Sequence, residues 1–213
     1  MKYIKKREEP ESFTAWKKLA NEDWSPSWDN FSKPEKTDVH DSLLQEQGYI
    51  CCYCGRLISN KTSHIEHLKP RKTYPHLTLD YTNILASCQR EREPKEPLHC
   101  GSSKDEWYDD NLMVSPLDIN CAEFFIYTED GQILSTEIID KKSAANITIN
   151  KLALNIDKLQ KMRIGAIEGI LEGLEELTDD EREMLLQRFC LPDENGHNEE
   201  FSAAITYILK QYI

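Results

Sequence analysis

Apolar residues near the start of the chain fall at helical spacing. Phe13, Trp16 and Leu19 are three positions apart, and this spacing predicts a helix over Glu11–Ala20. A short strand is expected to start at Tyr3, ahead of that helix. We expect this N-terminal segment to pack on the rest of the molecule.

A second helix is predicted over Glu35–Gln47. Gly48 follows it and acts as a stop signal, because glycine readily adopts the left-handed backbone that ends helices. The stretch Trp24–Pro34, with the sequence WSPSWDNFSKP, separates the two helices and is expected to be irregular and aromatic.

Short apolar pieces alternate with loops in the middle of the chain. Residues 49–58 and 62–68 are strand-like, and residues 83–88 follow as a further apolar piece. Residues 69–82 contain two prolines and are expected to form a loop. Residues 89–97, QREREPKEP, are a highly charged insertion.

The C-terminal half starts with a hairpin pattern and then becomes helical. Residues Glu123–Leu134 are predicted to form a β-hairpin, because Asp130-Gly131 is a typical hairpin turn. The composition is helical after Ser143. Asn155 is expected to cap a long helix over Ile156–Leu177, whose apolar residues recur at spacings of three and four.

Two more helices are predicted after the long one. Thr178–Glu181 has the capping-box pattern and opens a helix that runs to about Phe189. Residues 192–198 are expected to form a loop, and Phe201–Tyr212 a final helix. The pattern as a whole predicts an α+β fold with a helical C-terminal region.

The charge of the chain is unevenly distributed. The net charge is −12, which by itself argues against non-specific nucleic-acid binding. Residues 61–104, however, carry eight Lys and Arg against five Asp and Glu, whereas residues 137–213 carry nine against fifteen. The middle segment is where a phosphate-contacting site is expected, although ordinary fluctuation in composition also explains the difference.

No run of 18 apolar residues occurs, and the charged start MKYIKKREEPESF lacks the apolar core of a secretory signal. We therefore expect a cytoplasmic protein. Seven cysteines, an odd number, argue against a disulfide framework and favour metal or redox chemistry for the Cys-x-x-Cys pair at Cys51 and Cys54.

The cysteine spacing predicts a zinc site. Cys51 and Cys54 are followed by Gly55, as in tight turns that hold zinc, and the best candidates for the other two ligands are Cys88 and Cys100. A redox pair is disfavoured because the βαβ pattern is missing.

Several alternatives to this ligand set stay open. His99 can replace Cys100, Cys52 can displace Cys51, or all of the thiols can be buried without metal. The remaining two cysteines lie in apolar contexts and are expected to be packed thiols: Cys121 and Cys190.

The run His64-Ile65-Glu66-His67 carries candidate catalytic chemistry. On a strand, His64 and Glu66 share one face and His67 points to the other. Metal-assisted hydrolysis needs at least two groups: a carboxylate that holds a divalent cation, and a neutral imidazole that accepts a proton from water. Adjacent Glu and His residues supply both.

Four pieces of the sequence resemble the HNH nuclease motif of the ββα-metal fold. They occur in the same order as in that motif and are Cys51–Arg56, Ile65–Pro70, Asn83–Cys88 and Cys100–Lys104. The resemblance implies that Glu66 is a ligand of a catalytic Mg²⁺ or Mn²⁺, that His67 is the general base and that Asn83 hydrogen-bonds the intervening loop. It also implies a structural zinc ion on the four cysteines.

The match departs from the motif at its end. The position after the last cysteine is usually a His or Asn that helps to bind the catalytic metal, and here it is Gly101. Candidates to replace it are His64, His99 and Asp105, and His64 is placed beside Glu66 as the provisional second ligand.

A longer resemblance is to the PtuB family, the HNH nucleases of Septu and retron-type bacterial antiphage systems. It rests on the runs Ile65–Pro75 and Leu79–Asn83, on residues 115–133 and on Ile149–Asn155. It implies a PtuA-type ATPase partner and, in retron versions, a reverse transcriptase with its DNA–RNA product. Broad apolar stripes on the helices 156–177 and 201–212 are expected to face that ATPase or a second copy of the chain.

The expected organisation is a helical segment over residues 1–47, a zinc-braced HNH core with a β-hairpin over 48–136 and a helical region over 137–213. The competing readings are a catalytically silent zinc-binding adaptor for nucleic acid or protein, and a different enzyme that uses Glu66 and His67. Neither DNA nor RNA is favoured as the substrate, because no base-reading pattern is visible.

Overall fold

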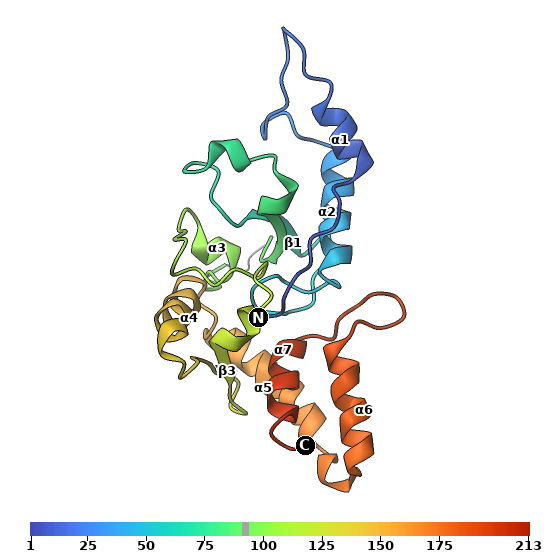
Figure 1. Ribbon diagram of the computed structural model, residues 1–213, viewed down its shortest axis with the longest axis vertical. Helices are drawn as coiled ribbons and strands as arrows, with labels where there is room; N and C mark the ends of the chain where they lie inside the picture. Colours follow the sequence, from blue (N-terminus) through green and yellow to red (C-terminus); the bar gives the residue numbers. More distant parts are fainter. Residues whose placement is uncertain (91–93) are drawn as a thin grey trace.

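The computed structural model describes residues 1–90 and 94–213, so part of the charged insertion at 89–97 lies outside the described residues. Helices and two small antiparallel sheets make up the described chain, which confirms the α+β class. None of its described helices is both long and apolar enough to cross a bilayer. Helices α1 and α2 lie at one end of the molecule and α5, α6 and α7 at the other, with β1 and α3 between them (Figure 1).

The N-terminal segment forms two helices, α1 (Glu11–Lys17) and α2 (Glu35–Glu46). Phe13 and Trp16 of α1 are buried against Phe31, but Leu19 is 62% exposed because α1 ends before it. The predicted helix was therefore too long at its C-terminal end. The prediction of a strand at Tyr3 was wrong, since the N-terminal segment runs without sheet pairing.

The central sheet pairs β1 (Ser63–His67) with β2 (Ile84–Cys88) in antiparallel register, with Glu66 opposite Leu85. Residues 49–58 form no strand and contribute one isolated bridge, between Ile50 and Leu57. This piece folds back on itself instead, which places its cysteines in a tight turn.

The connection between β1 and β2 contains two short 3₁₀ turns, η1 (Pro75–Leu77) and η2 (Tyr81–Asn83). A one-turn helix, α3 (Gly101–Lys104), follows β2. The order along the chain is thus strand, loop, strand and short helix, with the candidate chemistry on all four pieces.

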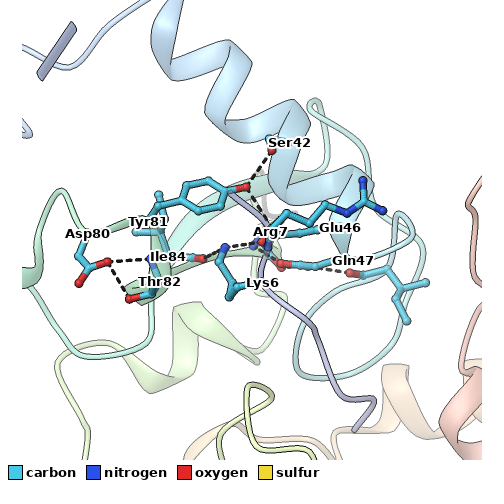
Figure 2. A network of polar contacts seen from close by, with 11 residues as sticks. Lys6, Arg7, Ser42, Glu46, Gln47, Asp80, Tyr81, Thr82 and Ile84 are labelled. Atoms are coloured by element: carbon cyan, nitrogen blue, oxygen red, sulfur yellow. Dashed lines mark hydrogen bonds and ion pairs between the residues drawn. The ribbon is translucent and has the colours of Figure 1, made fainter. Parts of the chain in front are cut away.

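Figure 2 shows the polar network that ties the N-terminal segment to this sheet. The Lys6 ammonium pairs with Glu46 of α2 and donates to the Ile84 carbonyl at 3.0 Å. The Tyr81 hydroxyl donates to Ser42 Oγ at 2.8 Å, and its ring lies 3.8 Å under the Lys6 ammonium. Because Ile84 follows Asn83 directly, this network fixes the start of β2.

The predicted hairpin is present as β3 (Phe125–Tyr127) and β4 (Ile133–Ser135), preceded by the 3₁₀ turn η3 (Cys121–Phe124). Gly131 has φ +74°, and a Cβ there would come within 2.5 Å of the Gln160 carbonyl oxygen. The turn therefore requires glycine both for its backbone conformation and for its contact with α5.

The C-terminal region consists of α4 (Ile139–Lys151), α5 (Asp157–Leu171), the 3₁₀ turn η4 (Leu174–Glu176), α6 (Asp179–Cys190) and α7 (Ser202–Leu209). The long helix ends well before Leu177 because Gly173 adopts the left-handed conformation at φ +81°. The capping box at Thr178 and Glu181 is confirmed.

Asn155 does not cap α5, contrary to the prediction. Its side chain accepts from Ile133 N at 2.9 Å and donates to Ile133 O at 2.8 Å, so it holds β4. The buried Arg163 of α5 adds to this contact, since its Nε donates to Gly131 O at 2.6 Å and its Nη2 to Leu154 O at 2.8 Å. The hairpin is thereby fixed on α5.

The apolar stripes of α5 and α7 are used within the chain. Leu159 and Ile167 of α5 and Ile205 and Ile208 of α7 are all buried in the chain's own clusters. These four residues are therefore not available to a partner, whereas Met162, Ile170 and Leu171 of α5 are only partly buried, and a partner contact there stays a prediction.

Candidate functional site

The structure brings together four cysteines that are far apart in the sequence. Their sulfur atoms all lie within 4.8 Å of one another, and Cys54 Sγ is 3.8 Å from Cys88 Sγ; the group comprises Cys51, Cys54, Cys88 and Cys100. Zn–S bonds of ~2.3 Å in a tetrahedron place sulfurs ~3.8 Å apart. This buried cluster fits a zinc ion in its donor type, number and spacing.

The local backbone explains how the cluster forms. Gly55, at φ +77°, lets the chain turn so that its N–H donates to Cys51 O at 3.0 Å. Cys88 ends β2 and donates its N–H to Cys51 Sγ at 3.4 Å, and Cys100 precedes α3. Burial by itself raises the pKa of Cys51, but hydrogen bonds from the surrounding thiols, that of Cys100 foremost, hold this pKa well below its usual value.

Neither alternative ligand displaces a member of the group. Cys52 is buried outside the cluster, and burial raises its pKa well above the usual value. His99 is fully buried with Nδ1 3.3 Å from Cys100 Sγ and 3.6 Å from Cys88 Sγ. His99 therefore contacts two of the sulfurs but lies outside the group of four.

His99→Ala is expected to weaken zinc binding by about 10–100-fold, because it removes a hydrogen bond to two thiolates and leaves the four sulfurs in place. Competition against a chromophoric chelator measures the affinity. His197→Ala, which changes a histidine with no contact to the cluster, is the matched control. An unchanged affinity in His99→Ala contradicts this role for the imidazole.

Glu66 is the centre of a second buried group. Its carboxylate is 3.1 Å from the Lys104 ammonium, 3.2 Å from the Tyr53 hydroxyl and 3.5 Å from His64 Nε2. Burial alone would raise the pKa of Glu66, but the hydrogen bond from His64 and the charge of Lys104 lower it below the usual value. Glu66 is thus an ionised carboxylate whose charge is already shared with Lys104 and His64.

Gly101 lies directly against this group. A Cβ at Gly101 would come within 2.5 Å of Glu66 Oε2 and 3.0 Å of His64 Nε2. Position 101 therefore adjoins the Glu66 carboxylate, and the ends of the Glu66 and His64 side chains lie in the space that a Cβ there would enter. Of the three candidate replacements, His64 adjoins Glu66, His99 contacts the cysteines and Asp105 is exposed.

The side chain of His67 contacts other residues than the side chain of Glu66 does. Its Nε2 is 3.0 Å from the Thr78 carbonyl oxygen, and its ring meets the indole of Trp28 edge-on at 4.4 Å between centroids. Burial lowers the pKa of His67 to about 4, against the opposing effect of the Thr78 hydrogen bond. The imidazole is therefore neutral at neutral pH, which is the form that accepts a proton.

Asn83 bridges the two ends of the loop that carries these contacts. Its Oδ1 accepts from Lys69 N at 2.9 Å, and its Nδ2 donates to Lys69 O at 3.0 Å and to Leu77 O at 3.2 Å. Since Leu77 precedes Thr78, Asn83 also fixes the carbonyl that contacts His67.

The sequence assigned no role to three side chains of the site. Lys104 is 2% exposed and paired with Glu66, Tyr53 donates to Glu66, and Trp28 contacts His67. Of the three, only Lys104 stood in the motif-like pieces outside the cysteine turn, as the last residue of Cys100–Lys104. Among the packed-thiol predictions, Cys121 is buried as expected, whereas Cys190 is exposed because α6 turns it to solvent.

Comparison with known proteins found no matching family model. The chain is 32% identical over 141 residues to a protein of Vibrio cholerae serotype O1 biovar El Tor named "Retron Vc95 putative HNH endonuclease". The match covers 64% of this chain and 66% of the relative, slightly less than two thirds of its length. This similarity supports an HNH endonuclease in a retron context.

Proposed function

We propose that this chain is a metal-dependent HNH endonuclease that hydrolyses phosphodiester bonds, with its residues 51–104 forming a ββα-metal core. The observation that carries the proposal is the adjacency of Glu66 and His67 on β1, beside a cluster of four thiols and the loop held by Asn83. The similarity to the Vibrio cholerae protein points the same way.

Each residue has a separate task in this proposal. His67 accepts the proton of the attacking water, and Asn83 holds the loop whose Thr78 carbonyl fixes the imidazole. Zn²⁺ on the four cysteines braces the turn, β2 and α3.

Glu66 and His64 supply two donors for Mg²⁺ or Mn²⁺, with a nitrogen and a carboxylate already side by side. The divalent cation, when bound, polarises the phosphate and stabilises the charge that develops on its oxygens. Lys104 already offsets the charge of Glu66 in the protein, so its buried ammonium competes with the cation for the carboxylate.

The basic middle segment is the surface proposed to meet the nucleic-acid backbone. Arg71 and Lys72 are exposed beside the loop that follows β1, and Lys69 lies over the rings of Tyr74 and Tyr108. Cationic side chains next to the scissile bond supply the charge that the acidic chain otherwise lacks.

The proposed setting is a bacterial antiphage system in which this chain is the nuclease effector and a PtuA-type ATPase is its partner. A retron reverse transcriptase with its DNA–RNA product, and a second copy of the chain, are further proposed partners. The retron named in the Vibrio cholerae relative supports this setting.

The test is a cleavage assay with Mg²⁺ or Mn²⁺ on DNA and RNA substrates, with and without co-expressed genomic neighbours. Glu66→Ala is expected to reduce cleavage roughly 100-fold by weakening the cation site, and excess Mn²⁺ should restore part of the rate. Glu137→Ala, which changes an exposed glutamate outside the site, is the control.

The second candidate function is a catalytically silent zinc-binding adaptor, favoured by Gly101 at the end of the motif and by the Lys104–Glu66 pair. An adaptor binds nucleic acid or partner equally well with and without Glu66→Ala, and it cuts under none of the metal conditions. That combination of results would replace the nuclease proposal.

A further inference from the structure

A recess lies beside His67 that none of the residues proposed for catalysis fills. It has a volume of about 290 Å³ and is lined by two segments, residues 26–28 and residues 75–79; the side chains are those of Pro26, Ser27, Trp28, Pro75, His76, Thr78 and Leu79. Prolines, an indole and a leucine make it largely apolar.

Two of the lining residues contact the proposed base directly. Trp28 meets the His67 ring at 4.4 Å, and the Thr78 carbonyl accepts a hydrogen bond from His67 Nε2 at 3.0 Å. A group seated in the recess is therefore separated from the imidazole only by residues that contact it.

Two cations flank the indole. The Lys36 ammonium is 4.6 Å from the Trp28 ring centroid, and the Arg71 guanidinium is 5.0 Å from it. Arg71 is exposed, and for a planar group to take its place on the ring its guanidinium has to turn outward, where a phosphate would lie. An aromatic face flanked by cations is the arrangement that binds a nucleotide through its base and its phosphate together.

We propose that this recess receives one unpaired base of the substrate, stacked on Trp28, next to the phosphate that is cut. The inference rests on the proposed nuclease function and adds to it a substrate class: a strand or loop with an unstacked base beside the scissile bond. A base inside a duplex presents only its edge to a groove and cannot place its face on a half-buried indole. The recess thus selects nucleic acid that is single-stranded at the cut.

Binding is measured on the full-length chain without added Mg²⁺ or Mn²⁺, so that the substrate is not cut and the contact of His67 with Trp28 is kept. The probes are fluorescent single-stranded oligonucleotides of DNA and of RNA, the same strands with abasic nucleotides, and the matched duplexes. Trp28→Leu is expected to weaken binding of the intact single strands by about 10- to 100-fold, and Trp28→Phe by much less, because phenylalanine keeps a stacking face.

The matched control is Trp24→Leu, which changes a half-buried tryptophan of the same segment that packs on Trp16 and does not line the recess. It should leave the Kd unchanged. Abasic strands lack the base that would stack on Trp28. The unmodified chain should therefore bind them about as weakly as Trp28→Leu binds the intact strands. This comparison tests the recess without any change to the protein. Duplex binding should not respond to Trp28→Leu.

Equal affinity of the Trp28→Leu and Trp28 chains for intact single strands would overturn the inference. So would a loss of affinity that is the same for intact, abasic and duplex probes. Cleavage by the same chains with Mg²⁺ or Mn²⁺ is measured in parallel. If the chain cuts nucleic acid and Trp28→Leu changes neither binding nor cleavage, the inference is wrong and the nuclease function stands. If binding depends on the base but no condition gives cleavage, the nuclease function is wrong.

Discussion

Loss of zinc is expected to unfold the centre of the molecule. Chelation or Cys54→Ser removes the ion that joins the turn at Cys51, the end of β2 and the start of α3, and it leaves buried thiols with no shared cation. Structural zinc contributes folding free energy directly. A loss of about 5 kcal/mol lowers the Tm of a chain of this size by about 10–20 °C.

Thermal melting with zinc analysis measures this effect, and hydrogen exchange shows whether β1 and β2 lose protection first. Cys190→Ser is the matched control, because Cys190 is exposed and outside the cluster. It should keep both the Tm and one zinc ion per chain. A folded, reduced preparation that contains no zinc would contradict the assignment.

His67→Ala is expected to reduce cleavage by about 10²–10⁴-fold, the usual cost of losing a general base. Fold and zinc content should be unchanged, because the imidazole makes no contact with the cysteine cluster and its hydrogen bond is to a single carbonyl. Excess Mn²⁺ should not restore the rate, in contrast to Glu66→Ala, since the missing group is a proton acceptor and not a metal ligand.

Single-turnover cleavage under matched metal and partner conditions is the measurement, with circular dichroism and zinc analysis alongside. His197→Ala is the control for this prediction, because His197 is an exposed histidine outside the site and the recess beside His67. The cleavage rate of Asn83→Ala should lie between that of His67→Ala and that of the unmodified chain, since this change loosens the loop without removing the base. If His67→Ala cuts as fast as the unmodified chain, another group is the base.

The parts of the fold that sequence predicted well are those in which short-range chemistry decides the structure. The capping box at Thr178 requires only residues within one turn, and the hairpin turn requires only Asp130-Gly131. The four cysteines were recognised because thiols at such spacing have few other uses.

The failures share a physical cause, which is competition from a distant partner. Asn155 has the local properties of a helix cap, but the free backbone groups of Ile133 offer its amide two hydrogen bonds in place of one. Lys104 and Trp28 are ordinary residues in sequence, and only the packing of α3 and of residues 18–34 brings them to Glu66 and His67.

Gly101 has a consequence for how this site can change during evolution. A Cβ at position 101 would come within 2.5 Å of Glu66 Oε2 and 3.0 Å of His64 Nε2, and both atoms are the far ends of side chains. A larger residue at position 101 therefore requires the side chains of Glu66 and His64 to shift. Substitutions at positions 64, 66 and 101 are expected to be coupled, so that the effect of one depends on the residues at the other two.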